Sequence, residues 1–200
     1  MATPVQTPFE AKTQEVFTAL LWALSRPGEV QAIPAGDDAF ALIGETLLDL
    51  ESSFYTPDET LRERLLLTGA PHVPATEAEY LFFSVWNDDA REAIRQARRG
   101  DALYPDRAAT LVLPAGFSGQ VWVWRGPGIN GEAHMSVTLP DDLAELREEA
   151  VQYPLGWDAF LVGECRVMGL PRTTQIEVTP LQPVHRQPVP IQPVHRQEEK

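Results

Sequence analysis

Arg172-Thr173-Thr174 is the polar cluster of this chain best suited to binding chemistry. A guanidinium group presents its N–H donors in a planar fork that matches the oxygens of a phosphate or phosphonate group. The two neighbouring hydroxyl groups add further hydrogen-bond donors. The alternative is that Arg172 pairs with an acidic side chain of its own chain while the threonines occupy strand positions. The sequence leaves both interpretations open, an anion-binding site or a structural ion pair.

No catalytic residue, metal site or cofactor is predicted. The single cysteine and four histidines include no HxxxH pair, so they lack the spacing of a zinc site. Gly116–Gly119 departs from the GxSxG spacing of a nucleophile elbow. Pro127 removes a backbone donor from the loop 126–131, which favours a tight turn over a phosphate cradle. Of the paired acids at 37–38, 88–89, 141–142 and 148–149, three pairs fall at or beside helix starts or outer faces, where solvated charge is ordinary.

Three tryptophans are the candidates for an interface. Trp122 and Trp124 alternate along one predicted strand and therefore share a face, and Trp157 follows a Pro-Leu-Gly turn. Aromatic side chains are frequent anchors of protein interfaces, but they are also frequent core residues. Both possibilities remain open from the sequence.

Composition limits the class of protein. A chain of 200 residues is long enough for one domain with a sizeable core. The net charge of −13 argues against binding of nucleic acid or an anionic membrane surface. No apolar run is long enough to span a bilayer, and no secretory signal is evident. The lone Cys165 excludes an intrachain disulfide and fits a reducing cytoplasm.

The elements that must position these residues alternate between helices and strands. Apolar periodicity and capping signals predict helices at 8–26, 39–50, 57–67, 88–99 and 141–151, with Thr7, Thr56 and Asn87 as caps. Strands are predicted at 29–33, 80–86, 109–113 and 120–124, and a hairpin of buried strands at 159–162 and 167–170. Such alternation predicts a single layered α/β/α domain with a mixed sheet over residues 1–178.

Residues 179–200 have a different character. The segment Gln182–Gln187 is repeated in full as Gln192–Gln197, and five of the 18 prolines fall in these last 22 residues. This composition cannot build a core and predicts a Pro-rich flexible tail.

Several short motifs, in order along the chain, resemble one bacterial family. The C-terminal block, with its Pro-Leu-Gly turn, Asp158 and the Pro-Arg-Thr-Thr segment, resembles the signature of the PhnH family of the carbon–phosphorus (C–P) lyase machinery. The other matching segments are Phe17 with Leu20–Gly28, Thr68–Pro71, Gly100 with Pro105 and Ala109–Val112, and Gly126–Ile129. The departures are Leu67 where the family often has His, Asp106 for Glu and Tyr153 for Phe.

The resemblance implies a subunit of a complex with PhnG-, PhnI- and PhnJ-like partners, and a homodimer when isolated. That complex forms a ribose 1-(alkylphosphonate) 5-triphosphate from ATP and an alkylphosphonate. The subunit would be structural rather than catalytic alone; the alternative is direct binding of the phosphonate or triphosphate through Arg172–Thr174. The family is also similar in architecture to pyridoxal-phosphate-dependent transferases, but neither Lys12 nor Lys200 is placed to bind that cofactor.

Overall fold

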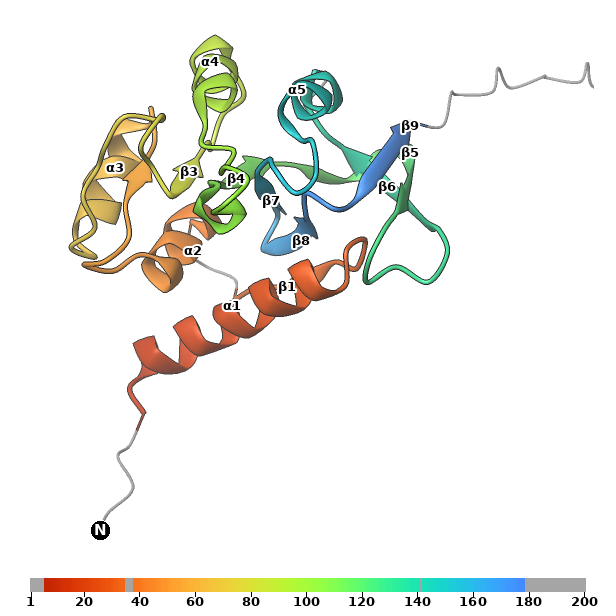
Figure 1. The fold of residues 1–200 in the computed structure, drawn as a ribbon. Coiled ribbons are helices and arrows are strands. Elements are labelled where there is room, and N and C mark those ends of the chain that lie inside the picture. The colour runs from red at the N-terminus through yellow and green to blue at the C-terminus, as the bar shows by residue number, and fades with distance from the viewer. Residues whose placement is uncertain (1–5, 35–37, 141, 179–200) are drawn as a thin grey trace, which may run out of the picture.

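The structure is a computed structural model that describes residues 6–34, 38–140 and 142–178 (Figure 1). The predicted Pro-rich tail at 179–200 lies outside the described residues. Among the residues described, no helix combines the length and apolar character needed to cross a bilayer.

A six-stranded mixed sheet forms the centre of the molecule. Its strands are β1 (Gln31–Ala32), β8 (Arg166–Leu170), β7 (Asp158–Gly163), β4 (Thr110–Pro114), β3 (Tyr80–Phe82) and β2 (Phe54–Tyr55), in that spatial order. β2, β3, β4 and β7 run parallel, whereas β8 pairs antiparallel with β7 and with β1. The predicted mixed sheet and the predicted β7–β8 hairpin are therefore confirmed.

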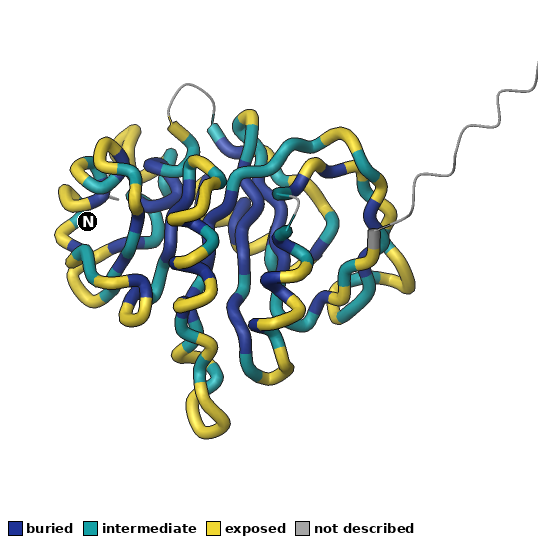
Figure 2. Tube along the Cα trace, turned by 90° about the horizontal axis from the view of Figure 1, so that it is seen from above, coloured by how far each residue is buried: buried dark blue, intermediate teal, exposed yellow. Residues whose placement is uncertain are grey.

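Both faces of this sheet are buried. Phe82, Val112 and Phe160 point to the face covered by α1 (Pro8–Ser25), α2 (Ala39–Leu47) and α3 (Glu59–Leu66). Their neighbours in the strands, such as Leu111 and Leu161, point to the face covered by α4 (Asp88–Gln96) and α5 (Leu143–Ala150). Figure 1 shows α1 on one side of the sheet and α4 and α5 on the other, and Figure 2 shows the buried strands at the centre. Burial on both faces explains why the strands read as continuous apolar runs.

A second, smaller sheet was not predicted. It consists of β6 (Ala133–Thr138), β5 (Gly116–Arg125) and β9 (Gln175–Val178), all antiparallel, in that order. β6 does carry a strand signal, because apolar and polar residues alternate strictly over Ala133–Thr138, but no strand was predicted there. Trp122 and Trp124 of β5 join the same apolar core as α4 and α5. The turn at 171–174 carries the chain from β8 of the large sheet into β9 of the small one.

The helix caps agree with the sequence at two of three positions. Thr7 and Glu10 form the predicted capping box at the start of α1, and the Asn87 side chain caps α4. The cap of α3 is Asp58, whose carboxylate accepts from the backbone N–H of Leu61. Thr56 was the wrong choice because its hydroxyl is buried and accepts from the backbone N–H of Asp58 instead.

Some predicted elements are shorter in the structure. α2 ends at Leu47, and Leu50, which was expected to be buried in the same helix, is 82% exposed in the following turn. The expected strand at 80–86 ends at Phe82, and the expected strand at 29–33 is reduced to the two residues of β1. α5 begins at Leu143, and Asp141 lies outside the described residues.

Candidate functional site

The turn formed by Pro171–Thr174 lies at the junction of the two sheets, beside a pocket. The backbone N–H of Thr174 donates to the carbonyl of Pro171 at 3.0 Å and closes the turn. The pocket has a volume of about 760 Å³ and lies between α5, this turn and the start of β9. Arg172, Thr173 and Thr174 all line it, so the structure brings the three predicted site residues to one pocket.

Arg172 is engaged by its own chain. Its Nη2 donates to Oδ2 of Asp158 at 2.6 Å, its Nε contacts both oxygens of the same carboxylate, and its backbone N–H donates to Oδ1 at 2.7 Å. Nη1 donates to the carbonyl of Pro105 at 2.7 Å. The side chain is only 15% exposed. This arrangement is the ion pair that the sequence left open as the alternative, and it leaves few Arg172 donors for a ligand.

The two threonines differ in their surroundings. Thr173 is half-buried on the pocket wall. Thr174 is only 3% exposed, and its hydroxyl oxygen has no hydrogen-bond partner among the described residues. Buried hydroxyl groups are usually paired, so an unpaired one beside a pocket is a candidate ligand contact.

Arg147 is the residue of this site that sequence reasoning missed. It lies on α5, lines the pocket and is only 4% exposed. Its Nη2 donates to the carbonyls of Pro171 and Thr174 at 2.5 and 3.0 Å, and the guanidinium lies 5.4 Å from the ring centre of Trp157. Its Nη1 is buried and has no hydrogen-bond partner among the described residues.

A signal for Arg147 was present in the sequence. Leu143, Leu146 and Ala150 form the inward face predicted for this helix, and position 147 is four residues after Leu143. Residues spaced by three, four and seven share one helix face, so Arg147 had to point inward as well.

Two positive groups, Arg147 and Arg172, and two negative groups, Asp158 and Glu148, lie around the pocket. Burial lowers the pKa of Arg147 to about 10; the nearby Asp158 opposes this effect, and the nearby Arg172 adds to it. The carboxylate of Asp158 is partly buried, and the ion pairs among the described residues include Arg172 with Asp158 but none of Arg147. Glu148 contributes an exposed carboxylate at the rim. Because Asp158 pairs with Arg172, the buried guanidinium of Arg147 is the group that an anionic ligand would pair with.

The three tryptophans are core residues in this chain. Trp122, Trp124 and Trp157 are all buried in the cluster beneath α4 and α5, so their indole rings are covered by the chain itself. Of the two possibilities that the sequence left open, this burial supports a place in the core rather than at an interface. The large aromatic side chains that are exposed lie elsewhere, at Phe9, Phe17, Trp22, Tyr104 and Tyr153.

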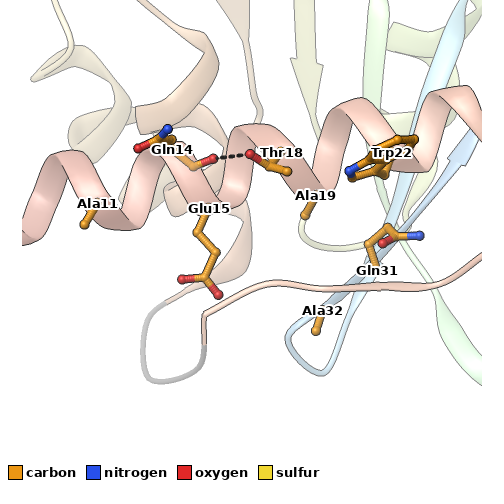
Figure 3. Close-up of a pocket in the computed structure, with 8 residues that line it drawn as sticks. All are labelled: Ala11, Gln14, Glu15, Thr18, Ala19, Trp22, Gln31 and Ala32. Atoms are coloured by element: carbon orange, nitrogen blue, oxygen red, sulfur yellow. Dashed lines mark hydrogen bonds between the residues drawn. The ribbon is translucent and has the colours of Figure 1, made fainter.

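A second pocket lies between α1 and β1 and has different chemistry. Figure 3 shows Glu15, Trp22 and Gln31 among the side chains that surround its volume of about 430 Å³. Trp22 is partly exposed and stacks with the guanidinium of Arg26, 4.3 Å from the ring centre. The carboxylate of Glu15 is the only charged group of the lining, so this pocket does not suit an anion.

Metal and nucleophile chemistry has little basis in the described part of the chain. No group of three or more His, Cys, Asp or Glu side chains there is arranged to hold a metal ion. The pocket beside the Pro171–Thr174 turn offers guanidinium and hydroxyl groups, which are suited to binding an anion.

Comparison with known proteins agrees with the motifs. The family model for PhnH, described as a bacterial phosphonate metabolism protein, matches residues 6–177. The chain is 31% identical to the "Alpha-D-ribose 1-methylphosphonate 5-triphosphate synthase subunit PhnH" of Rhizobium meliloti, with 84% of this chain and 91% of that protein covered. It is 30% identical to the "Putative C-P lyase subunit protein HtxG" of Stutzerimonas stutzeri, with 84% and 87% covered. A match over nearly the whole described chain shows that the protein belongs to the PhnH family.

Proposed function

We propose that this chain is a subunit of a C–P lyase complex for the use of alkylphosphonates. In that complex it supports the formation of a ribose 1-(alkylphosphonate) 5-triphosphate from ATP and the phosphonate. The observation that carries the proposal is the match to two relatives, both named as subunits, over 84% of this chain. The chemistry of the described residues fits a structural subunit, because the pocket beside the turn presents no nucleophile with an adjacent base.

The partners of this proposal are PhnG-, PhnI- and PhnJ-like subunits in the cytoplasm, with a homodimer as the isolated form. An iron–sulfur cluster used by such a complex would belong to a partner, because Cys165 alone cannot supply the thiolate ligands. The architecture of pyridoxal-phosphate-dependent transferases remains our expectation for the ancestry of the fold, without their cofactor. Lys12 lies on α1, far in sequence from the pocket residues 147 and 171–176.

Co-expression tests this proposal. The chain and its PhnG-, PhnI- and PhnJ-like partners from the same source should purify as one complex, and the isolated chain should show no phosphonate-dependent turnover of ATP. Turnover by the pure chain would make it an enzyme in its own right. Failure of the correctly folded chain to join its partners would contradict the subunit function.

A second candidate is direct binding of the phosphonate or triphosphate by Arg172, Thr173 and Thr174. Their shared position on one pocket favours it, and the engagement of Arg172 with Asp158 argues against Arg172 as the main cation. Binding of a phosphonate to the isolated chain would support this candidate if Arg172→Ala abolishes that binding while circular dichroism shows an intact fold.

A further inference from the structure

We propose that the pocket between α5 and the Pro171–Thr174 turn binds a tetrahedral oxyanion of the phosphate or phosphonate class, and that Arg147 is its principal cation. The inference deepens the second candidate function by assigning the charge to a different residue. It rests on three features: a buried cation without an ion pair, an unpaired buried hydroxyl and the lining of the pocket.

The buried cation is the first argument. An arginine side chain stays protonated near neutral pH, and even the pKa of about 10 of Arg147 leaves it charged there. Two carbonyl groups accept hydrogen bonds from its Nη2, but carbonyls do not neutralise the charge. Buried charges are normally paired with an opposite charge, because an uncompensated one is strongly unfavourable. Among the described residues Arg147 forms no direct ion pair, although the charge of Asp158 acts on it, and an anionic ligand would supply that pair.

The unpaired hydroxyl of Thr174 is the second argument. Arg147 Nη2 contacts the carbonyl of this same residue, so the guanidinium and the threonine are neighbours at the pocket. Among the described residues both Arg147 Nη1 and Thr174 Oγ1 lack a hydrogen-bond partner. A guanidinium N–H and a hydroxyl O–H are the donors that proteins commonly offer to phosphate oxygens.

The remainder of the lining suits a small organic anion. Val151 and Ile176 are half-buried apolar side chains on the pocket wall, and Ala144 leaves space beside them. The volume of the pocket, about 760 Å³, lies within the common range for small-molecule sites. A cationic floor with an apolar wall fits a phosphonate group that bears an alkyl substituent.

Entry of the anion requires a local movement. Nη1 of Arg147 and Oγ1 of Thr174 are both covered in the free chain. An anion reaches them when the turn and α5 separate slightly, which loosens the contacts of Nη2 with the Pro171 and Thr174 carbonyls. Binding is therefore coupled to rearrangement of residues 171–176 at the junction of the two sheets.

Isothermal titration of the full isolated chain with methylphosphonate, and separately with inorganic phosphate, tests the proposal. We expect saturable one-site binding that Arg147→Met weakens at least about ten-fold, because a charge-assisted hydrogen bond is lost. Arg95→Met removes a half-exposed arginine of α4 and should leave the affinity unchanged. Tighter binding of methylphosphonate than of phosphate would show that the apolar wall contacts the methyl substituent. Equal binding would show that the site recognises only the oxyanion that both ligands share.

A second variant, which fills the pocket, distinguishes loss of the binding site from misfolding of Arg147→Met. Ala144→Phe keeps Arg147 in place but occupies the pocket, so it should abolish binding while the circular dichroism spectrum stays that of the parent chain. The proposal is overturned if the parent chain binds neither anion, or if both variants bind as the parent does. A third result would also overturn the proposal: the parent chain binds no anion, and Arg147→Met no longer co-purifies with the partner subunits. That result would identify a partner's carboxylate as the counter-ion of Arg147.

The two proposals fail in different experiments. Anion binding is measured on the isolated chain, whereas the subunit function is measured by co-purification with the partners. A chain that joins its partners without binding an anion contradicts only the inference about Arg147.

Discussion

The guanidinium of Arg172 and the carboxylate of Asp158 close the open end of the β7–β8 hairpin. Asp158 is the first residue of β7, and Arg172 follows β8 by two residues, just beyond the last paired positions, Ala159 and Leu170. Nη2 and Oδ2 are 2.6 Å apart, and the backbone N–H of Arg172 donates to the other oxygen. The pair thereby fixes the direction in which the chain leaves the large sheet for the small one.

Removal of one member of this pair should destabilise the fold. Arg172→Met leaves the partly buried carboxylate of Asp158 and the carbonyl of Pro105 without their donors, and we expect a loss of about 2–3 kcal/mol in the free energy of unfolding. Urea denaturation measures it. Arg62→Met, which removes a surface pair with Glu59 on α3, is the control and should cost less than about 1 kcal/mol. Equal effects of the two variants would contradict the structural importance of the Arg172 pair.

A double-mutant cycle distinguishes the pair from the individual residues. Arg172→Met, Asp158→Asn and the double variant should give a coupling energy of about 1–3 kcal/mol, because the two side chains contact each other directly. A coupling near zero would mean that the carbonyl of Pro105, rather than Asp158, accounts for the effect of Arg172.

Gly169 should tolerate no side chain. In β8 it faces the backbone of α1, where an added Cβ would lie 2.4 Å from the carbonyl oxygen of Ala23 and 2.7 Å from the backbone nitrogen of Leu24. Since backbone atoms cannot move aside, Gly169→Ala should cost about 1–3 kcal/mol of stability and shift the thermal midpoint downward. Gly116→Ala is the control, because its new Cβ would come no nearer than 3.3 Å to a side-chain atom of Thr138. A Gly169→Ala protein as stable as its parent would show that α1 lies further from β8.

The elements with strong local signals were predictable from the sequence. The capping box of Thr7 and Glu10 fixes the start of α1, and the apolar runs at 159–162 and 167–170 form β7 and β8 as expected. The small sheet was predicted only in part. A strand was expected at 120–124, within β5, whereas the alternation of apolar and polar residues in β6 was overlooked. The pairing of β5 with β6 and β9 into a separate sheet could not be read from either pattern alone.

The site was predictable only in part. The Pro171–Thr174 segment was identified by its chemistry, but the partner of Arg172 is 14 residues away and one of its carbonyl acceptors is 67 residues away. The helical spacing of α5 does place Arg147 on the inward face, yet its lack of a counter-ion depends on the three-dimensional positions of every nearby carboxylate. The same reason applies to Trp122 and Trp124: alternation shows that they share a face, and only packing shows that this face is covered.

Asp58 should make stability depend on pH in the acid range. Its pKa is lowered from the ordinary value of 3.8, first by the hydroxyl of Ser84 and then by the backbone N–H of Leu61, while burial acts in the opposite direction. A carboxyl group whose folded pKa is lowered contributes stability above its unfolded pKa, and this contribution is lost as the pH falls through the folded pKa. Asp58→Asn should therefore be about 1 kcal/mol less stable than the parent at pH 7, with the difference shrinking below pH 4.

Urea denaturation at pH 7 and at pH 3 measures this change. Glu63→Gln, on the exposed side of the same helix, is the control and should differ little from the parent at either pH. A gap between Asp58→Asn and the parent that stays constant from pH 7 to pH 3 would mean that the charge of Asp58 adds nothing to the cap.

Thr174→Val should move stability and anion affinity in opposite directions. The hydroxyl of Thr174 is buried and unpaired among the described residues, and valine replaces it with a methyl group of similar shape. Without ligand the variant should be about 0.5–1.5 kcal/mol more stable, because an unsatisfied buried polar group is removed. With methylphosphonate present it should bind several-fold more weakly than the parent, because one donor to the oxyanion is gone. Thermal unfolding with and without the ligand measures both effects in one experiment. A hydroxyl with a purely structural partner would give a variant that is less stable in both conditions, and that outcome would count against the site.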